Sequence, residues 1–169
     1  MKFNYECEET DGLVLIDENN LCELNDELLY AMDIFLDRYG KSELIYDFPD
    51  EKWELVRKRE TLILEEFCNA GKMVLFLVNE DEMNCEIQFS TKKTETNTFL
   101  DVSSGKIILV NASELIQCLA YPDLEMEKIL ELYDLEKGMY AIENEGIRKI
   151  TCIKCDTDKS IFSNVIECD

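Results

Sequence analysis

The chain has 169 residues, the size of one domain, and 46% of them are hydrophobic, which excludes a disordered acidic tail. It contains 38 acidic residues, 17 basic residues and no histidine, so its formal charge is −21. Exposed acids repel nucleic acid and anionic membranes, and we therefore expect neither as a direct partner. The absence of histidine also excludes serine–histidine and cysteine–histidine catalytic pairs. We expect a single acidic domain over residues 1–169.

The N-terminal third predicts a hairpin and a helix. Residues 2–8 and 13–17 have the composition of strands, and Asp11-Gly12 between them is a dipeptide typical of tight turns. Apolar residues then recur at three- and four-residue spacing over residues 24–39, which predicts a helix that stops at Gly40.

A second, longer helix is predicted after Pro49-Asp50, with Asp50 as its N-cap and Gly71 as its end. Its inner stripe is apolar except for Glu60. The same helix carries Arg57-Lys58-Arg59, the one run of three bases in the sequence.

The rest of the chain is predicted to be mostly strand. Continuous or alternating apolar runs indicate strands at residues 73–78, 85–89, 97–102, 106–110, 139–143, 148–155 and 161–167. Two short helices are expected at residues 111–119 and 122–132. Runs of like elements favour an α+β fold, with a mostly antiparallel sheet packed against two main helices and two short ones.

The cysteines and the metal-binding motifs favour a reduced, cytoplasmic protein without a cofactor. The sequence starts without an apolar leader, and its longest apolar run falls far short of the roughly 20 residues that span a membrane. The pair Cys152 and Cys155 has the spacing of half a zinc site, but the other half is missing. The stretch from Asp156 resembles a calcium loop that has Ile161 where glycine is required. We expect no metal, and no phosphate-binding glycine motif is present.

Three acidic patches are candidates for binding a basic partner. On the first helix a stripe is formed by Asp26, Tyr30, Asp33 and Asp37. A second patch, expected in a loop after the strand at residues 73–78, consists of Glu80, Asp81 and Glu82. A third crowds the late helix region with Glu125, Glu127, Glu131, Asp134 and Glu136. We favour the first patch because Tyr30 supplies an aromatic anchor, the alternative being an ordinary solvated helix face.

In size, acidity and element order, the chain resembles the immunity proteins that bacteria pair with secreted polymorphic toxins. The segments at residues 102–110 and 135–142 also resemble strand–turn stretches of uncharacterised bacterial domains. The resemblance implies a non-enzymatic inhibitor that neutralises a basic toxin domain by direct binding. The alternatives are a nucleic-acid mimic that inhibits a host defence or DNA-binding protein, a carboxylate-dependent enzyme, and a structural subunit.

Overall fold

The computed structural model describes residues 2–39, 50–92, 94–112, 114–115 and 128–168. Within these ranges, the side chains of residues 4–11, 32–39, 50–53, 56 and 79–83 are not described. The described part contains two long helices and eight strands. In chain order they are β1 (Lys2–Asp17), α1 (Glu18–Tyr39), α2 (Asp50–Asn69), β2 (Met73–Ser90), β3 (Phe99–Val102), β4 (Ile107–Asn111), β5 (Lys128–Leu132), β6 (Gly138–Glu145), β7 (Lys149–Lys154) and β8 (Val165–Glu167).

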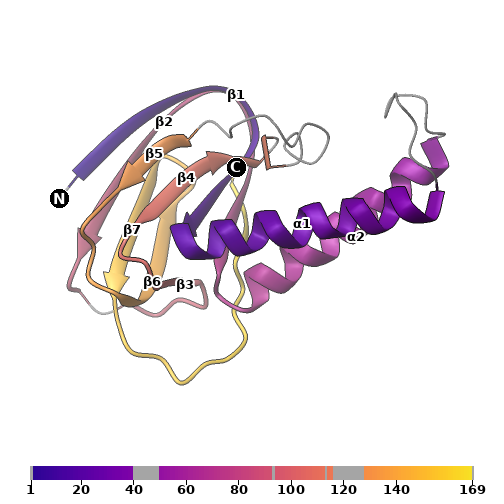
Figure 1. The fold of residues 1–169 in the computed structure, drawn as a ribbon. Coiled ribbons are helices and arrows are strands. Elements are labelled where there is room, and N and C mark those ends of the chain that lie inside the picture. Colours follow the sequence, from indigo (N-terminus) through magenta and orange to yellow (C-terminus); the bar gives the residue numbers. More distant parts are fainter. Residues whose placement is uncertain (1, 40–49, 93, 113, 116–127, 169) are drawn as a thin grey trace.

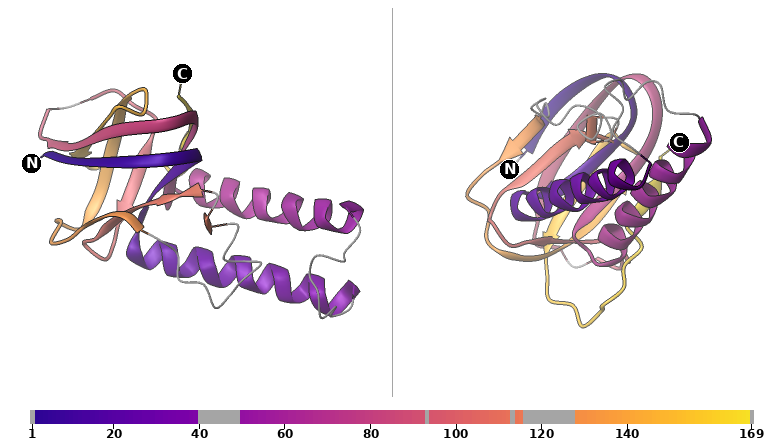
Figure 2. Two further views of the ribbon diagram at one scale, coloured as in Figure 1. Left: turned by 90° about the horizontal axis from the view of Figure 1, so that it is seen from above. Right: turned by 45° about the vertical axis from the view of Figure 1, so that its right-hand side comes forward.

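The strands form one curved sheet in the order β3-β6-β7-β2-β1-β4-β5, and β8 pairs with β2 outside this path. The pairings of β2 with β7 and with β8 are parallel, and the others in the described chain are antiparallel. The prediction of an α+β fold with a mostly antiparallel sheet is therefore confirmed. Helices α1 and α2 run side by side and extend beyond the sheet as a helical hairpin (Figures 1 and 2).

The two faces of the sheet carry separate apolar cores. Leu13, Leu15 and Phe76 belong to the core on the concave side, together with residues of all the strands from β3 to β7. Val14 and Met73 point to the other face, where they pack with Leu24, Leu28, Ile63 and Phe67 of the two helices. The central parts of β1 and β2 are thus buried on both faces, which explains why their sequences are continuously apolar.

The predicted hairpin at Asp11-Gly12 is wrong, because β1 runs through it as one strand. Thr10 pairs with Glu80 and Gly12 with Leu77, so two steps along β1 match three along β2. This is a β-bulge, with the extra residue on β2. A Cβ at Gly12 would lie 2.9 Å from the carbonyl oxygen of Phe76. Glycine is therefore required here for the close approach of two backbones, and not for a tight turn.

The predicted loop at Glu80, Asp81 and Glu82 is also wrong, because β2 continues through these residues as one strand. These residues lie inside β2, and Glu82 pairs with Glu8 of β1. Before the bulge, Val74 and Val78 face the concave core, whereas after it Cys85 and Ile87 do. The bulge shifts the alternation by one residue, so one long strand has two apolar patterns that resemble two strands.

The short helices are predicted less accurately. Residues 128–132 form β5, which contradicts the C-terminal part of the helix expected at 122–132; residues 122–127 lie outside the described chain. Asn111 ends β4, and Ala112, Glu114 and Leu115 are helical, while residues 116–119 are not described. The expected strands at 97–102 and 106–110 exist, but they do not pair with each other: β3 pairs with β6, and β4 pairs with β1 and β5.

The buried Asp17 carboxylate connects the start of α1 to the turn between β3 and β4. Its Oδ1 accepts hydrogen bonds from Asn19 N at 3.0 Å and Ser103 Oγ at 3.1 Å. Its Oδ2 accepts from Ser104 N at 2.9 Å and Ser104 Oγ at 2.7 Å. Asp17 thus acts as the N-cap of α1 and fixes the direction in which the helical hairpin leaves the sheet.

The buried amide of Asn164 joins edge strand β3 to the middle of the sheet. Its Nδ2 donates to the carbonyls of Met73 at 2.7 Å and Phe99 at 2.6 Å, and its Oδ1 accepts from Phe99 N at 3.0 Å. The Asn164 carbonyl also accepts from Leu75 N at 2.8 Å. One side chain therefore satisfies three backbone groups that the ladders leave open.

Replacing Asn164 by alanine should lower the free energy of unfolding by about 2–4 kcal/mol, because three buried backbone groups lose their partner. Chemical denaturation measures this loss. Asn144→Ala is the matched control, since the Asn144 amide makes a local bond to the Gly146 carbonyl at 2.9 Å. A loss at Asn164 no larger than at Asn144 would contradict the role assigned to Asn164.

Candidate protein-binding surface

Helix α1 separates its apolar and acidic residues onto opposite sides. Leu21, Leu24 and Leu28 are buried against the sheet and α2. Asp26 is exposed, and Tyr30 is 65% exposed, on the side of α1 opposite its buried leucines. Asp33 and Asp37 continue this spacing along α1, but their side chains lie outside the described set. Of the predicted stripe, the structure therefore places Asp26 and Tyr30 together on an exposed helix face.

The other predicted acidic residues that the structure describes do not lie on helix α1. Glu80, Asp81 and Glu82 lie in the β1–β2 ladder. In the third patch, Glu131 pairs with Lys106 at 3.1 Å and Lys128 at 2.9 Å. The Tyr133 hydroxyl, followed by Lys128 and Lys106, lowers the pKa of Glu131 to about 2. Glu136 pairs with Lys154, so two carboxylates of this patch are neutralised by bases of the same chain. Glu125 and Glu127 lie outside the described residues.

A second acidic feature, which the sequence did not predict, is the groove between α1 and α2. The groove has a volume of about 260 Å³. The exposed residues Glu23, Glu27 and Glu66 form its rim, and the half-buried Lys72 also lines it. The buried residues Ile63 and Phe67 form its apolar floor, and the exposed Ala70 also lines it. The sequence contained a partial signal, because Glu23 and Glu27 are one turn apart, but only the pairing of the helices adds Glu66.

Lys72 shows how this groove holds a positive charge. Its Nζ lies 2.5 Å from Glu23 Oε1 and 5.0 Å from the centre of the Phe67 ring. A carboxylate and an aromatic face together are a favourable environment for an ammonium group. Within the described part of the chain, the carboxylates of Glu27 and Glu66 form no hydrogen bond or ion pair. The groove therefore keeps an excess of negative charge.

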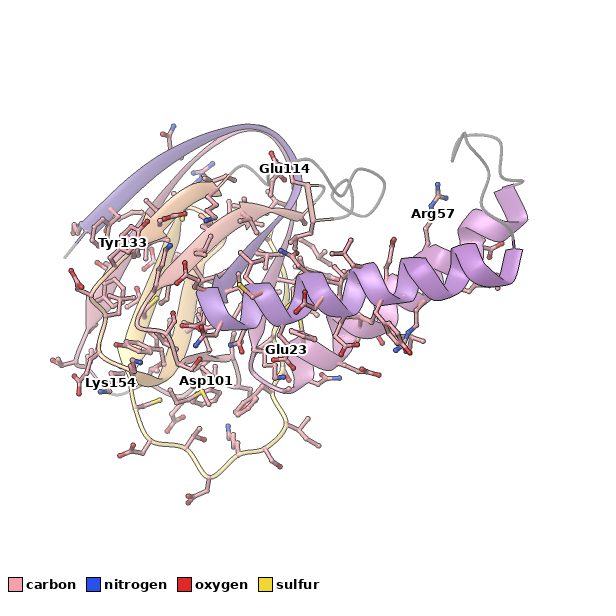
Figure 3. The ribbon with its side chains drawn as sticks, in the orientation of Figure 1. Glu23, Arg57, Asp101, Glu114, Tyr133 and Lys154 are labelled. Carbon is pink, nitrogen blue, oxygen red and sulfur yellow. The ribbon has the colours of Figure 1, made fainter. Side chains whose placement is uncertain are left out.

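The bases of α2 lie elsewhere on the helical hairpin. Arg57, Lys58 and Arg59 are exposed, and Lys58 pairs with Glu54 at 3.0 Å. Figure 3 shows Arg57 nearer the free end of the hairpin and well away from Glu23 at its base. The acidic groove is thus not neutralised by Arg57.

Glu60 is the buried carboxylate that interrupted the predicted apolar stripe of α2. Only 6% of the residue is exposed, and no hydrogen bond or ion pair to its side chain is found within the described residues. Desolvation raises the pKa of Glu60, against a smaller opposing effect of Arg57. A buried carboxylate without a partner costs stability at neutral pH, when it is charged.

The cysteine pair of the predicted half zinc site is split between two clusters. Cys152 is buried in the concave core, whereas Cys155 packs on the other face of the sheet near Phe99 and Phe162. Burial raises the pKa of the Cys152 thiol to about 12. Among the described side chains, no three metal-ligating residues gather in one place. Neither described helix is long and apolar enough to cross a membrane.

Replacing Glu60 by methionine should raise the free energy of unfolding at pH 7 by about 1–3 kcal/mol, because burial disfavours the charged carboxylate. The folded-state pKa of Glu60 is raised, so its penalty is present above that pKa and disappears as the pH falls and the carboxyl is protonated. The advantage of the variant should therefore shrink in acid. Denaturation as a function of pH measures it, with exposed Glu65→Met as the control. An equal effect of the two substitutions would contradict this interpretation.

Comparison of the chain with models of protein families, with curated proteins and with solved structures finds no match.

Proposed function

We propose that this protein is an inhibitory binding protein that covers a basic surface of its partner with the outer side of the α1–α2 hairpin. The observation that carries the proposal is the exposed face of α1, where Tyr30 stands beside Asp26 on a helix firmly held by its buried opposite stripe. Acidic side chains attract a basic partner and orient it. An exposed tyrosine adds a large contact area at small cost in conformational entropy.

Exposed apolar residues support a fitted protein interface on the hairpin. Besides Tyr30, the partly exposed large side chains include Leu29 at 38%, Leu55 at 47% and Leu62 at 50%, all on the two helices. A single exposed leucine is common on protein surfaces. Here three exposed leucines lie on the projecting hairpin together with an excess of carboxylates. This combination fits a surface that binds a protein better than a DNA mimic with regularly spaced carboxylates.

The partner that we propose is a basic toxin domain, which makes the chain an immunity protein of a bacterial toxin system. The proposal rests on the resemblance in size, acidity and element order, on the net charge of −21 and on the projecting helical hairpin (Figure 1). Such an inhibitor needs no chemistry of its own, because occlusion of the toxin surface is sufficient.

The first test is kinetic and uses a basic partner recovered by pull-down at low salt. The association rate constant should fall steeply as salt rises, because attraction between exposed charges is screened beyond about 8 Å at physiological ionic strength. The dissociation rate constant should change much less. An association rate that does not depend on salt would refute electrostatic steering.

Two substitutions localise the interface. Tyr30→Ala should speed dissociation about tenfold or more, the effect of losing an interface anchor. Asp26→Asn should mainly slow association, roughly twofold. Asp158→Asn, an equal charge change on the exposed loop between β7 and β8, is the control. If Tyr30→Ala leaves dissociation unchanged, the face of α1 is not the binding surface.

A further inference from the structure

The groove between α1 and α2 has the size and chemistry of a socket for one long basic side chain. Its volume of about 260 Å³ is below the roughly 300–1,000 Å³ of small-molecule sites. The apolar lining of Ile63, Phe67 and Ala70 suits the methylene stem of a lysine or arginine. The carboxylates of Glu27 and Glu66 on the rim suit its charged head.

The chain itself provides the precedent for this mode of binding. The Lys72 ammonium lies in the lining of the groove and contacts both the Glu23 carboxylate and the Phe67 ring. A second cation from outside would find the same combination of apolar floor and carboxylates next to it. Because Lys72 neutralises Glu23, the carboxylates of Glu27 and Glu66 give the groove its negative charge. This charge favours a cation over an anion or a neutral group.

We propose that the groove receives a single arginine or lysine side chain of the basic partner, as the anchor of the interface. The inference rests on the proposed function and deepens it by naming the element of the partner that enters. The carboxylates of Glu27 and Glu66 bind the cationic head, and Ile63 and Ala70 pack against its stem. Lys72 limits the socket to one cation by holding Glu23.

The test uses a blocked glycine–arginine–glycine tripeptide as the probe, and the same peptide with citrulline in place of arginine. Citrulline keeps the shape of the side chain and removes its charge. Titration followed by the methyl NMR signals of Ile63 and Ala70 should show saturable shifts with arginine and none with citrulline. Shifts that are equal for the two peptides, or absent from these methyl groups, would overturn the proposal.

Substitutions of the rim carboxylates distinguish binding in the groove from attraction by the net charge of the whole protein. Glu27→Gln and Glu66→Gln should each weaken binding of the arginine peptide by roughly two- to fivefold, the range of exposed ion pairs. Glu65→Gln removes the same charge from the neighbouring position outside the groove and should leave binding unchanged. An equal loss in Glu65→Gln and Glu66→Gln would show attraction by total charge alone and would overturn the socket.

The substitution Lys72→Met should strengthen binding of the arginine peptide, whereas the substitutions at Glu27 and Glu66 should weaken it. Without the ammonium, Glu23 becomes available, and the arginine peptide should bind more tightly, which a damaged fold would not produce. Unchanged or weaker binding would contradict the role of Lys72.

Two outcomes distinguish the socket from the proposed function. If the arginine peptide does not bind while the basic partner still binds with steep salt dependence, the socket is wrong and the proposed function survives. If association with the partner does not depend on salt, the proposed function itself fails.

Discussion

Burial of the central parts of β1 and β2 on both faces is the constraint on which the rest of the structure depends. Leu15 and Phe76 point into the concave core, while Ile16 and Met73 contact the helix side. Neither face of these strands tolerates water, so one face must be covered by the curving sheet and the other by helices. The helical hairpin is this cover. Its inner stripe is apolar because it packs on the sheet, and its acids are consequently displaced to the outer side.

The acidic outer surface is therefore a consequence of the fold as well as of composition. Within α1, the same spacing that buries Leu24 and Leu28 exposes Asp26 and Tyr30. Asp17 contributes by capping α1 and fixing its exit from the sheet. A binding face that projects on two mutually supported helices is preorganised, which reduces the entropy lost when a partner docks. Glu60 is the exception inside this element, since its burial disfavours the charged carboxylate and costs stability.

The local periodicity of the sequence was sufficient to predict the two long helices and most strands. It failed where long-range pairing decides the outcome. Asp11-Gly12 has the composition of a turn, yet Gly12 is needed because the Phe76 carbonyl approaches it across the ladder. The bulge on β2 reverses the alternation of that strand, so acids at residues 80–82 seemed to mark a loop. The outer face of α1 was predicted because it depends on one helix alone. The groove was missed because Glu27 and Glu66 meet only when two helices pair.

The central claim is that the outer side of the α1–α2 hairpin is the surface that meets a basic partner. Amide hydrogen exchange of the chain, alone and in complex with the partner, tests it most directly. We expect added protection concentrated in α1 and α2, with the exchange of β6 and β7 unchanged. Added protection of the sheet with unchanged exchange in both helices would contradict it.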